Sequence, residues 1–311
     1  MNVVPIVFAF DKNLILPACV CMSSLMINSK PETFYDIFIL SDDCSLTTGN
    51  ISLLIENYSN CRITFRKVGN IFDGAFEIRG ITSATYYRLL IPEIIPEYDK
   101  IIYSDVDVIF RNDLSEIFNN FEMEDNYVAG VKSLSNLFPD YRDYYTNKIG
   151  IDPSNVIYAG NMIINSKKIR EDCLIDKFKL LIKNNYKFQD MDIINIACNG
   201  KILYLPPCFC LTMDINMLAI MNPEELIKVW HKDDINYAIK FGIVHYNGPK
   251  PWNGYCVNFD IWWEYYRKSP FFNSKFYFDF FYAKLNELDL LPLWKRIKIL
   301  VRYFVFGRKI N

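Results

Sequence analysis

Residues 100–110 read KIIYSDVDVIF, and this stretch decides the fold. The apolar side chains at both ends predict a buried strand, yet two carboxylates, Asp105 and Asp107, stand at its centre. Burying two neighbouring carboxylates is unfavourable unless a cation or several hydrogen-bond donors compensate their charge. The stretch therefore predicts a strand that leads into a binding site with a positively charged partner.

The spacing of the two acids indicates the kind of partner. Side chains two residues apart on an extended segment point to the same face, so the oxygens of Asp105 and Asp107 can converge on one divalent cation. Open α/β sheets bind ligands at the carboxyl ends of their strands, which is where these acids are expected to lie. A metal site at this edge of a sheet is the first prediction.

Apolar runs of strand length alternate with helical patterns before this stretch, at residues 3–10, 16–28, 35–40, 51–58 and 61–68. The alternation is typical of right-handed βαβ units around a mostly parallel sheet. After it, the patterns predict a short helix at 113–121, strands at 126–131, 155–165 and 242–248, a long amphipathic helix at 171–185 and an aromatic helix at 259–268. We therefore predict an α/β fold whose central sheet becomes mixed.

The composition is that of a globular protein, with 51% hydrophobic and 23% charged residues in a chain of 311. No window approaches the roughly 20 consecutive apolar residues of a membrane-spanning helix, and MNVVPIVFAF has neither the basic segment nor the cleavage site of a signal peptide. The nine cysteines are irregularly spaced, so we interpret them as core thiols rather than disulfides or zinc ligands. We expect a cytoplasmic protein with no nucleic-acid partner.

The charge is uneven along the chain. Residues 294–311 hold six basic residues and no acid, which leaves 28 basic against 36 acidic residues elsewhere. As a helix, this tail has opposite cationic and apolar faces, formed by Lys295, Lys298 and Arg302 and by Trp294, Ile297, Val301 and Phe304. Such a helix can lie in a membrane interface; packing on the body or an oligomer contact are the alternatives. We expect a body, residues 1–265, and a membrane-associating helical tail, residues 266–311.

The chain has only two histidines, so each can be interpreted individually. His231 lies in the charged stretch KVWHKDD and is expected at the surface. His245 follows an apolar strand and precedes a Gly/Pro loop that contains Lys250; on its own it reads as a core histidine. Combined with Asp105 and Asp107, it completes an O/O/N ligand set that suits Mn²⁺ or Mg²⁺ and leaves coordination positions for phosphate oxygens. Lys250 can supply a further positive charge to the same phosphate groups.

Several segments together resemble a known family: FAFDKN, TSATYYRLL, YSDVDVIF, YAGNMIIN, FQDMDIIN and HYNGPKPW. In this order they are similar to glycosyltransferase family 8, in particular its bacterial lipopolysaccharide and lipooligosaccharide galactosyl- and glucosyltransferases. The resemblance covers residues 3–252. It implies a GT-A fold, which is a Rossmann-like nucleotide-binding fold, with a UDP-glucose or UDP-galactose donor, Mn²⁺ and retention of anomeric configuration.

The resemblance also implies roles for individual residues. The metal ligands would be Asp105, Asp107 and His245. The nucleotide would be bound at Ala9, Asp11, Asn13, Ile81, Val106, Gly248 and Lys250, the last two on the diphosphate. Arg88 and Asp190 would lie near the donor sugar, although a structural ion pair is the alternative interpretation of Arg88.

Three positions depart from the family pattern and concern the sugar rather than the nucleotide. The family's DQD reads Asp190, Met191, Asp192, so a thioether stands where the galactosyltransferases have an amide. The family's NAG motif has Tyr158 in place of its Asn, and Ser133 stands where the family has an Asp that contacts the sugar. Because a thioether cannot act as a nucleophile, Met191 favours front-face attack over a covalent intermediate.

These observations predict a retaining hexosyltransferase that acts on a saccharide of a glycolipid or surface polysaccharide, at the inner face of the cell membrane. One alternative is a haloacid-dehalogenase-like phosphatase, whose D-x-D-x-V motif also fits DVDV. That alternative needs a later pair of acids, for which Asp233 and Asp234 are the close candidates. A second alternative is a sugar-nucleotide-binding protein without activity.

Overall fold

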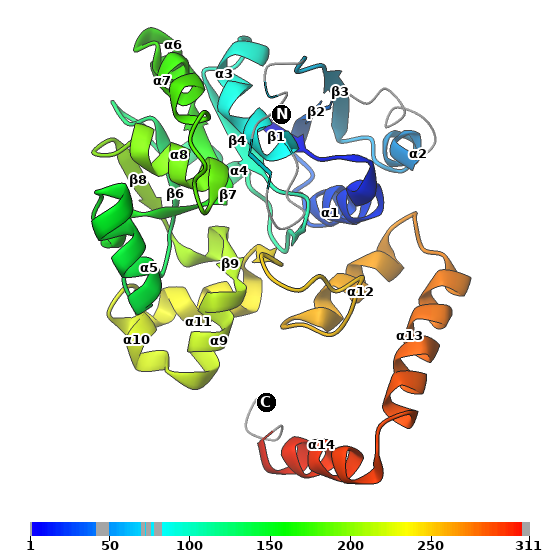
Figure 1. Cartoon of the computed structure of the whole chain (residues 1–311). Helices are drawn as coiled ribbons and strands as arrows, with labels where there is room; N and C mark the ends of the chain where they lie inside the picture. The colour runs from blue at the N-terminus through cyan, green and yellow to red at the C-terminus, as the bar shows by residue number, and fades with distance from the viewer. Residues whose placement is uncertain (1, 42–49, 70–71, 73–75, 78–82, 307–311) are drawn as a thin grey trace.

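The computed structural model describes residues 2–41, 50–69, 72, 76–77 and 83–306 (Figure 1). A seven-stranded sheet has the order β3-β2-β1-β4-β7-β6-β8. Its strands are β1 (Asn2–Ala9), β2 (Thr33–Leu40), β3 (Cys61–Arg66), β4 (Lys100–Ser104), β6 (Val128–Lys132), β7 (Ile157–Asn165) and β8 (Ile202–Leu205). β1, β2, β3 and β4 run parallel, whereas β7 is antiparallel to both of its neighbours. The predicted mixed α/β sheet is confirmed.

A smaller sheet brings together segments that are far apart in the sequence. It has the order β5-β10-β9, with β5 at Val108–Ile109, β9 at Leu211–Thr212 and β10 at Val244–His245. β10 pairs antiparallel with β5, so that His245 lies opposite Val108. This short pairing places the only buried histidine of the described residues beside the segment that carries the two aspartates.

Helices cover both faces of the large sheet. They are α1 (Ile15–Ile27), α2 (Asn50–Asn57), α3 (Ile91–Ile94), α4 (Ser115–Asn120), α5 (Pro139–Asp143), α6 (Ser166–Glu171), α7 (Leu174–Leu181), α8 (Gln189–Ala197), α9 (Met213–Met221), α10 (Pro223–Ile227), α11 (Lys232–Phe241), α12 (Phe259–Lys268), α13 (Ser274–Asp289) and α14 (Leu293–Phe306). Short 3-10 segments at Lys12–Leu14, Ser83–Leu90, Pro153–Asn155 and Pro207–Phe209 and a π segment at Tyr144–Ile149 complete the described elements.

The alternation of side chains along β1 divides the core in two. Val4, Ile6 and Phe8 face the cluster that contains α1 and α12, whereas Val7 faces the cluster that contains α3, α7 and α8. A parallel strand between two helical layers is apolar on both faces, which explains the nearly continuous apolar sequences of β1 and β2. The described cysteines are free thiols; five of them are buried, as the core-thiol interpretation predicts, whereas Cys173 is exposed and Cys208 and Cys256 are half-buried.

One predicted helix is wrong in its extent. Residues 171–185 were expected to form one helix, but Cys173 has a left-handed backbone (φ 51°) between α6 and α7. The chain turns at this residue, and only α7 keeps the amphipathic pattern, with Leu174, Ile175 and Phe178 buried. A non-glycine residue at positive φ has no reliable sequence signal, which is why the break was missed.

α12 lies against the body, whereas α13 and α14 extend progressively farther from it, as Figure 1 shows. In α12, Trp262, Trp263 and Tyr266 are buried, and rings of α13 such as Phe280 pack on Trp263 with centroids 4.6 Å apart. The expected division after residue 265 falls inside α12, so a separate tail unit stays a prediction. Of the helices described, none is long and apolar enough to cross a membrane.

Candidate active site

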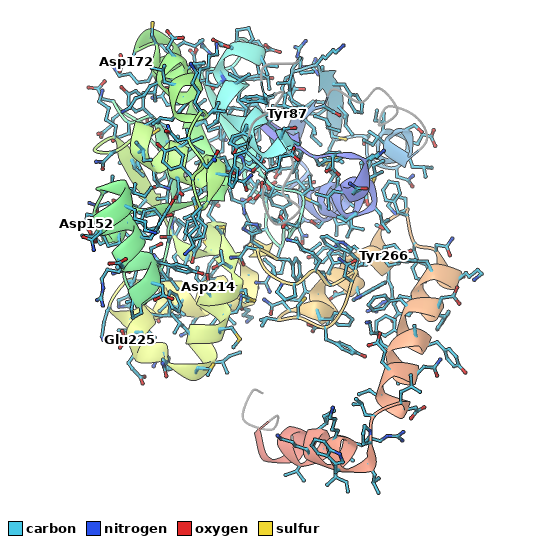
Figure 2. The ribbon with its side chains drawn as sticks, viewed as in Figure 1. Tyr87, Asp152, Asp172, Asp214, Glu225 and Tyr266 are labelled. Atoms are coloured by element: carbon cyan, nitrogen blue, oxygen red, sulfur yellow. The ribbon has the colours of Figure 1, made fainter. Side chains whose placement is uncertain are left out.

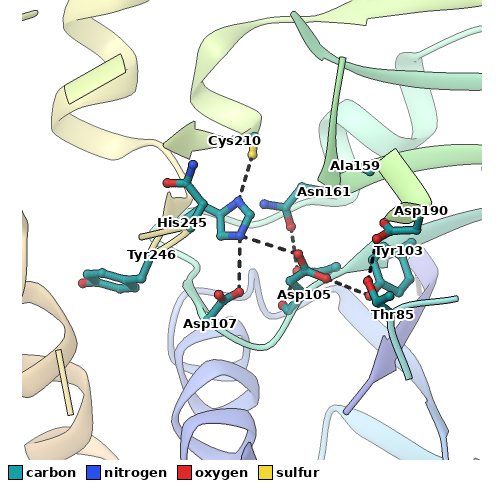
Figure 3. Close-up of polar contacts among 12 residues, drawn as sticks. Thr85, Tyr103, Asp105, Asp107, Ala159, Asn161, Asp190, Cys210, His245 and Tyr246 are labelled. Atoms are coloured by element: carbon teal, nitrogen blue, oxygen red, sulfur yellow. Dashed lines mark hydrogen bonds and ion pairs between the residues drawn. The ribbon is translucent and has the colours of Figure 1, made fainter. Parts of the chain in front are cut away.

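Asp105, Asp107 and His245 lie together at the carboxyl end of β4 (Figure 3). β4 ends at Ser104 and β5 begins at Val108, so the two acids occupy the connection between these strands rather than one continuous strand. His245 Nε2 lies 3.5 Å from Asp105 Oδ2 and 3.3 Å from Asp107 Oδ1. One ligand atom from each of the three residues falls within 4.8 Å of the others.

This cluster fits a hard divalent cation. Ligands about 2.1 Å from an octahedral ion are separated by about 3 Å when adjacent, which is close to the separations found here. Two carboxylate oxygens and one imidazole nitrogen suit Mn²⁺ or Mg²⁺ and leave coordination positions for other oxygens. The side chain of His245 is 8% exposed and that of Asp107 is 16% exposed, so surrounding protein atoms fix both side chains in position.

Arg88 connects Asp190 to the cluster of Asp105, Asp107 and His245, called here the metal-type cluster. Its guanidinium bonds to Asp105 Oδ1 at 2.7 Å, lies 3.1 Å from Asp190 Oδ2 and donates to the carbonyl of Ala159 at 2.7 Å. The guanidinium also stacks over Tyr103, 4.3 Å from the ring centroid. This ion pair is the structural interpretation of Arg88, and it also places Arg88 in the wall of the candidate site.

Asp190 is buried against this pair. Burial raises the pKa of Asp190 to about 6, although Arg88 and a hydrogen bond from Thr85 favour the charged form. Thr85 Oγ1 donates to Asp190 Oδ1 at 2.6 Å, so both carboxylate oxygens are engaged. The carboxylate is therefore fixed in position between Thr85 and Arg88.

Lys250 reaches the cluster from the opposite side. Its ammonium group donates to Asp107 Oδ2 and to the carbonyl oxygen of Tyr246. Burial would raise the pKa of Asp107, but Lys250 and His245 outweigh that effect and lower it below its usual range. The lysine predicted to bind a diphosphate is thus within reach of the metal-type carboxylates.

A cavity of about 640 Å³ opens over the cluster. The described residues that the sequence predicted for the site all line it: Ala9, Asp11, Asn13, Arg88, Asp105, Val106, Asp107, Asp190, His245, Gly248 and Lys250. Ile81 lies outside the described residues. Residues from both halves of the chain therefore line one cavity.

The family is decided by comparison with known sequences, because the model of glycosyl transferase family 8 matches residues 5–256. The chain belongs to glycosyltransferase family 8. A putative glycosyltransferase of Haemophilus influenzae is 27% identical over 215 residues, or 61% of each chain. The lipopolysaccharide 1,2-glucosyltransferase of Escherichia coli K12 is 22% identical over 81% of this chain and 73% of its own length.

Solved structures give the fold. The galactosyltransferase LgtC, in complex with donor and acceptor sugar analogues, has a TM-score of 0.70 and 25% identity over 87% of this chain and 98% of LgtC. The bifunctional glycosyltransferase WbbM has a TM-score of 0.71 over 89% of this chain and 51% of its own. The chain has the GT-A fold of these family neighbours.

The relatives differ from this chain in length, and the acids needed for the phosphatase alternative lie away from the cavity. The chain spans 61% of the length of the Haemophilus relative and 60% of the glycosyltransferase GlyE of Streptococcus pneumoniae. Asp233 and Asp234 lie exposed at the start of α11, next to the exposed His231, and do not line the cavity. Family membership and this placement argue against the phosphatase alternative.

The structure also shows residues in or behind the cavity wall that the sequence reasoning missed. Tyr103 donates to Asp105 Oδ1 at 2.8 Å, and Cys210 Sγ lies 3.4 Å from His245 Nδ1. Gln189 is buried in the cavity wall with a left-handed backbone (φ 47°). Tyr103 had a usable signal, since it stands two residues before Asp105, whereas the contact of Cys210 depends on pairing between β9 and β10.

The positions that depart from the family pattern differ in their placement. Met191 and Tyr158 line the cavity. Ser133 is buried, and its hydroxyl lies 2.7 Å from that of Ser135, which does line the cavity. Asp192 accepts hydrogen bonds from Tyr144 and Tyr145 and is a core residue.

Proposed function

We propose that this chain is a metal-dependent, retaining hexosyltransferase. It would transfer glucose or galactose from a UDP-sugar to a saccharide on a glycolipid or surface polysaccharide of the lipopolysaccharide type. The carrying observation is the convergence of Asp105, Asp107 and His245 in a cavity that belongs to a family 8 fold. Two similar proteins, a lipopolysaccharide glucosyltransferase and a galactosyltransferase, support this substrate class.

The three clustered side chains would hold Mn²⁺, or Mg²⁺. A bound cation of this kind supplies Lewis acidity that stabilises negative charge on a leaving diphosphate. Lys250 and the backbone at Gly248 would contact the same phosphates. The nucleoside would lie along Ala9, Asp11, Asn13, Ile81 and Val106.

Arg88 and Asp190 act on the sugar side of the proposed site. Arg88 holds the carboxylates of Asp105 and Asp190 at a fixed separation. Both oxygens of Asp190 are engaged, which supports an orienting charge rather than a nucleophile. Met191 lines the cavity but cannot form a glycosyl ester, so we propose front-face attack with the leaving phosphate accepting the acceptor's proton.

The tail is proposed to bind a membrane surface. α14 exposes Trp294 (61%), Ile297 (51%) and Val301 (53%), and its Lys295 and Lys298 are exposed as well. Arg302 and Phe304 belong to α14, but their side chains lie outside the described part of the chain. An apolar face and cations worth about 1 kcal/mol each near anionic headgroups would hold the enzyme at the inner face of the cell membrane.

Hydrolysis and binding of UDP-sugars test the activity. We expect slow Mn²⁺-dependent release of UDP from UDP-glucose or UDP-galactose without acceptor, and loss of this release and of metal-dependent UDP binding in Asp107→Ala. Asp234→Ala, on the exposed start of α11, is the matched control and should behave as the wild type. UDP binding without turnover of any sugar nucleotide, with or without acceptors, would instead support the non-catalytic alternative.

Vesicle sedimentation tests the tail. The full chain should sediment with anionic vesicles and be released by salt, because screening weakens the attraction of the exposed cations. A chain that ends at Leu290 should stay in solution and still hydrolyse the UDP-sugar, which also reports that its body is folded. Equal sedimentation of both chains would exclude the tail as the anchor.

A further inference from the structure

Asp214 lines the cavity but is absent from the predicted site. It lies in the first turn of α9, as Figure 2 shows, and its side chain is partly buried. The hydroxyl of Tyr158 is 3.4 Å from Asp214 Oδ2, a long contact. An ionised carboxylate has roughly four acceptor positions, so most of its hydrogen-bonding capacity is unused.

Asp214 differs in its charge partners from the other acids around the metal-type cluster. Asp105 and Asp190 share Arg88, and Asp107 is paired with Lys250. Within the described part of the chain, no Lys, Arg or His side chain forms an ion pair with Asp214. Burial raises the pKa of Asp214, and the hydrogen bond from Tyr158 offsets this effect only in part.

The wall formed by Asp214 borders the cluster. The side chain of Tyr158 and a Cβ built at Gly160 lie on the same face of β7, because residues two apart on a strand share a face. A Cβ at Gly160 would touch His245 and Asp105, and one at Gly248 would touch the sulfur of Met213 at 2.9 Å. Asp214 therefore lies between β7 and the loop that carries Lys250, in the wall of the cavity that also contains the cluster.

We propose that Asp214 determines specificity by accepting hydrogen bonds from the hydroxyls of a neutral saccharide and by repelling saccharides that carry a carboxylate. This inference rests on the proposed function, and the saccharide can be the donor's hexose or the acceptor. A hydrogen bond between a hydroxyl and a buried carboxylate contributes about tenfold to hundredfold in kcat/KM. A uronate would bring a second negative charge against Asp214, and like charges brought together oppose binding of the wrong partner.

The donor arm of the test uses the full chain with Mn²⁺ and no acceptor. UDP release is measured from two matched pairs, UDP-glucose with UDP-glucuronate and UDP-galactose with UDP-galacturonate. For donor recognition, we expect Asp214→Asn to lower kcat/KM for the neutral substrate about tenfold or more and to reduce the preference over the uronate by a similar factor. Asp214→Glu should retain the preference because it retains the charge.

The acceptor arm compares transfer to methyl β-glucoside and to methyl β-glucuronide from the donor that is turned over. A change of preference confined to this arm would assign Asp214 to the acceptor. Asp234→Asn, on the exposed start of α11, is the control for loss of one surface charge. Should Asp214→Asn fail to fold, Tyr158→Phe removes the hydroxyl that contacts Asp214 Oδ2, together with its contact to the Leu134 amide, and should shift the same preference by a smaller factor.

The outcomes separate the two proposals. A wild type that neither binds nor turns over any of the four nucleotides refutes the proposed function itself. A wild type that is active, with the neutral-to-uronate preference of Asp214→Asn unchanged in every arm that turns over, refutes only the role of Asp214. A reduced preference with unchanged Mn²⁺-dependent UDP affinity supports it, because a merely structural defect would not change a ratio between substrates.

Discussion

Replacing Gly160 with alanine tests whether Asp105, Asp107 and His245 act as one metal site. Gly160 lies in β7, directly behind the cluster. A Cβ at this position would lie 2.2 Å from His245 Cε1, 2.8 Å from His245 Nδ1 and 2.8 Å from Asp105 Oδ2. One added methyl group therefore meets two of the three predicted ligands.

The size of the displacement follows from these distances. Non-bonded carbon atoms need about 3.5 Å, so the imidazole must move by more than about 1 Å, whereas metal–ligand distances tolerate about 0.2 Å. The backbone of β7 cannot retreat easily, because it pairs with β4 and β6, and the carbonyl of Gly160 accepts from the Asp105 amide at 2.7 Å. We expect Mn²⁺ affinity and UDP release each to fall about a hundredfold.

Mn²⁺ binding is measured by isothermal titration calorimetry, and UDP release and thermal unfolding are measured on the same samples. Gly130→Ala is the matched control, since a Cβ there would lie 2.7 Å from Ile157 Cδ1 in the neighbouring strand and away from the cluster. Both variants should lose about 1–3 kcal/mol of unfolding free energy through overpacking. Only Gly160→Ala should lose Mn²⁺ affinity.

Two results would refute this reasoning. Mn²⁺ binding of Gly160→Ala at wild-type affinity would show that the ion, if bound, is not held by His245 and Asp105 together. Equal loss of Mn²⁺ affinity in Gly130→Ala would show that the effect comes from general loosening of the sheet rather than from the added methyl group at the ligands.

Two further substitutions separate binding roles within the cavity. Lys250→Met should leave Mn²⁺ binding without nucleotide intact or up to about fivefold tighter, because the ammonium no longer competes for Asp107. The same variant should bind UDP with Mn²⁺ at least about tenfold more weakly, since a charge-assisted hydrogen bond is lost, and parallel loss of both affinities would indicate a purely structural lysine. Met191→Ala should retain a measurable fraction of UDP release, because the thioether shapes the cavity without bonding to the sugar; a loss as deep as in Asp107→Ala would show that position 191 contributes more than packing.

Local patterns were sufficient where neighbouring residues determine the structure. β1 and β2 could be predicted because each is an apolar run followed by a helical pattern, and the pairing of Asp105 with Asp107 because the two are only two residues apart. His245 could be included because the chain has only two histidines, and His231 is exposed as expected. The acids were expected at the carboxyl end of a strand, and they follow the last residue of β4, in the connection to β5.

Contacts made by distant segments could not be predicted from local patterns. Arg88 and Asp190 are about a hundred residues apart, and nothing near either residue indicates their ion pair. Asp214 was missed because a single acid at the start of a helix is an ordinary helix-terminal charge in sequence. Its place in the cavity wall, in contact with Tyr158, becomes apparent only in the folded structure.

The structure also explains why two carboxylates are tolerated in the middle of an apolar stretch. The outer oxygen of each acid is held by its own cation, Asp105 Oδ1 by Arg88 and Asp107 Oδ2 by Lys250. The inner oxygens, Asp105 Oδ2 and Asp107 Oδ1, both face His245 Nε2 (Figure 3). Charge compensation alone would be met by one cation on each acid. The two remaining oxygens and the imidazole nitrogen converge on one point, which forms an O/O/N set of the kind that binds Mn²⁺ or Mg²⁺.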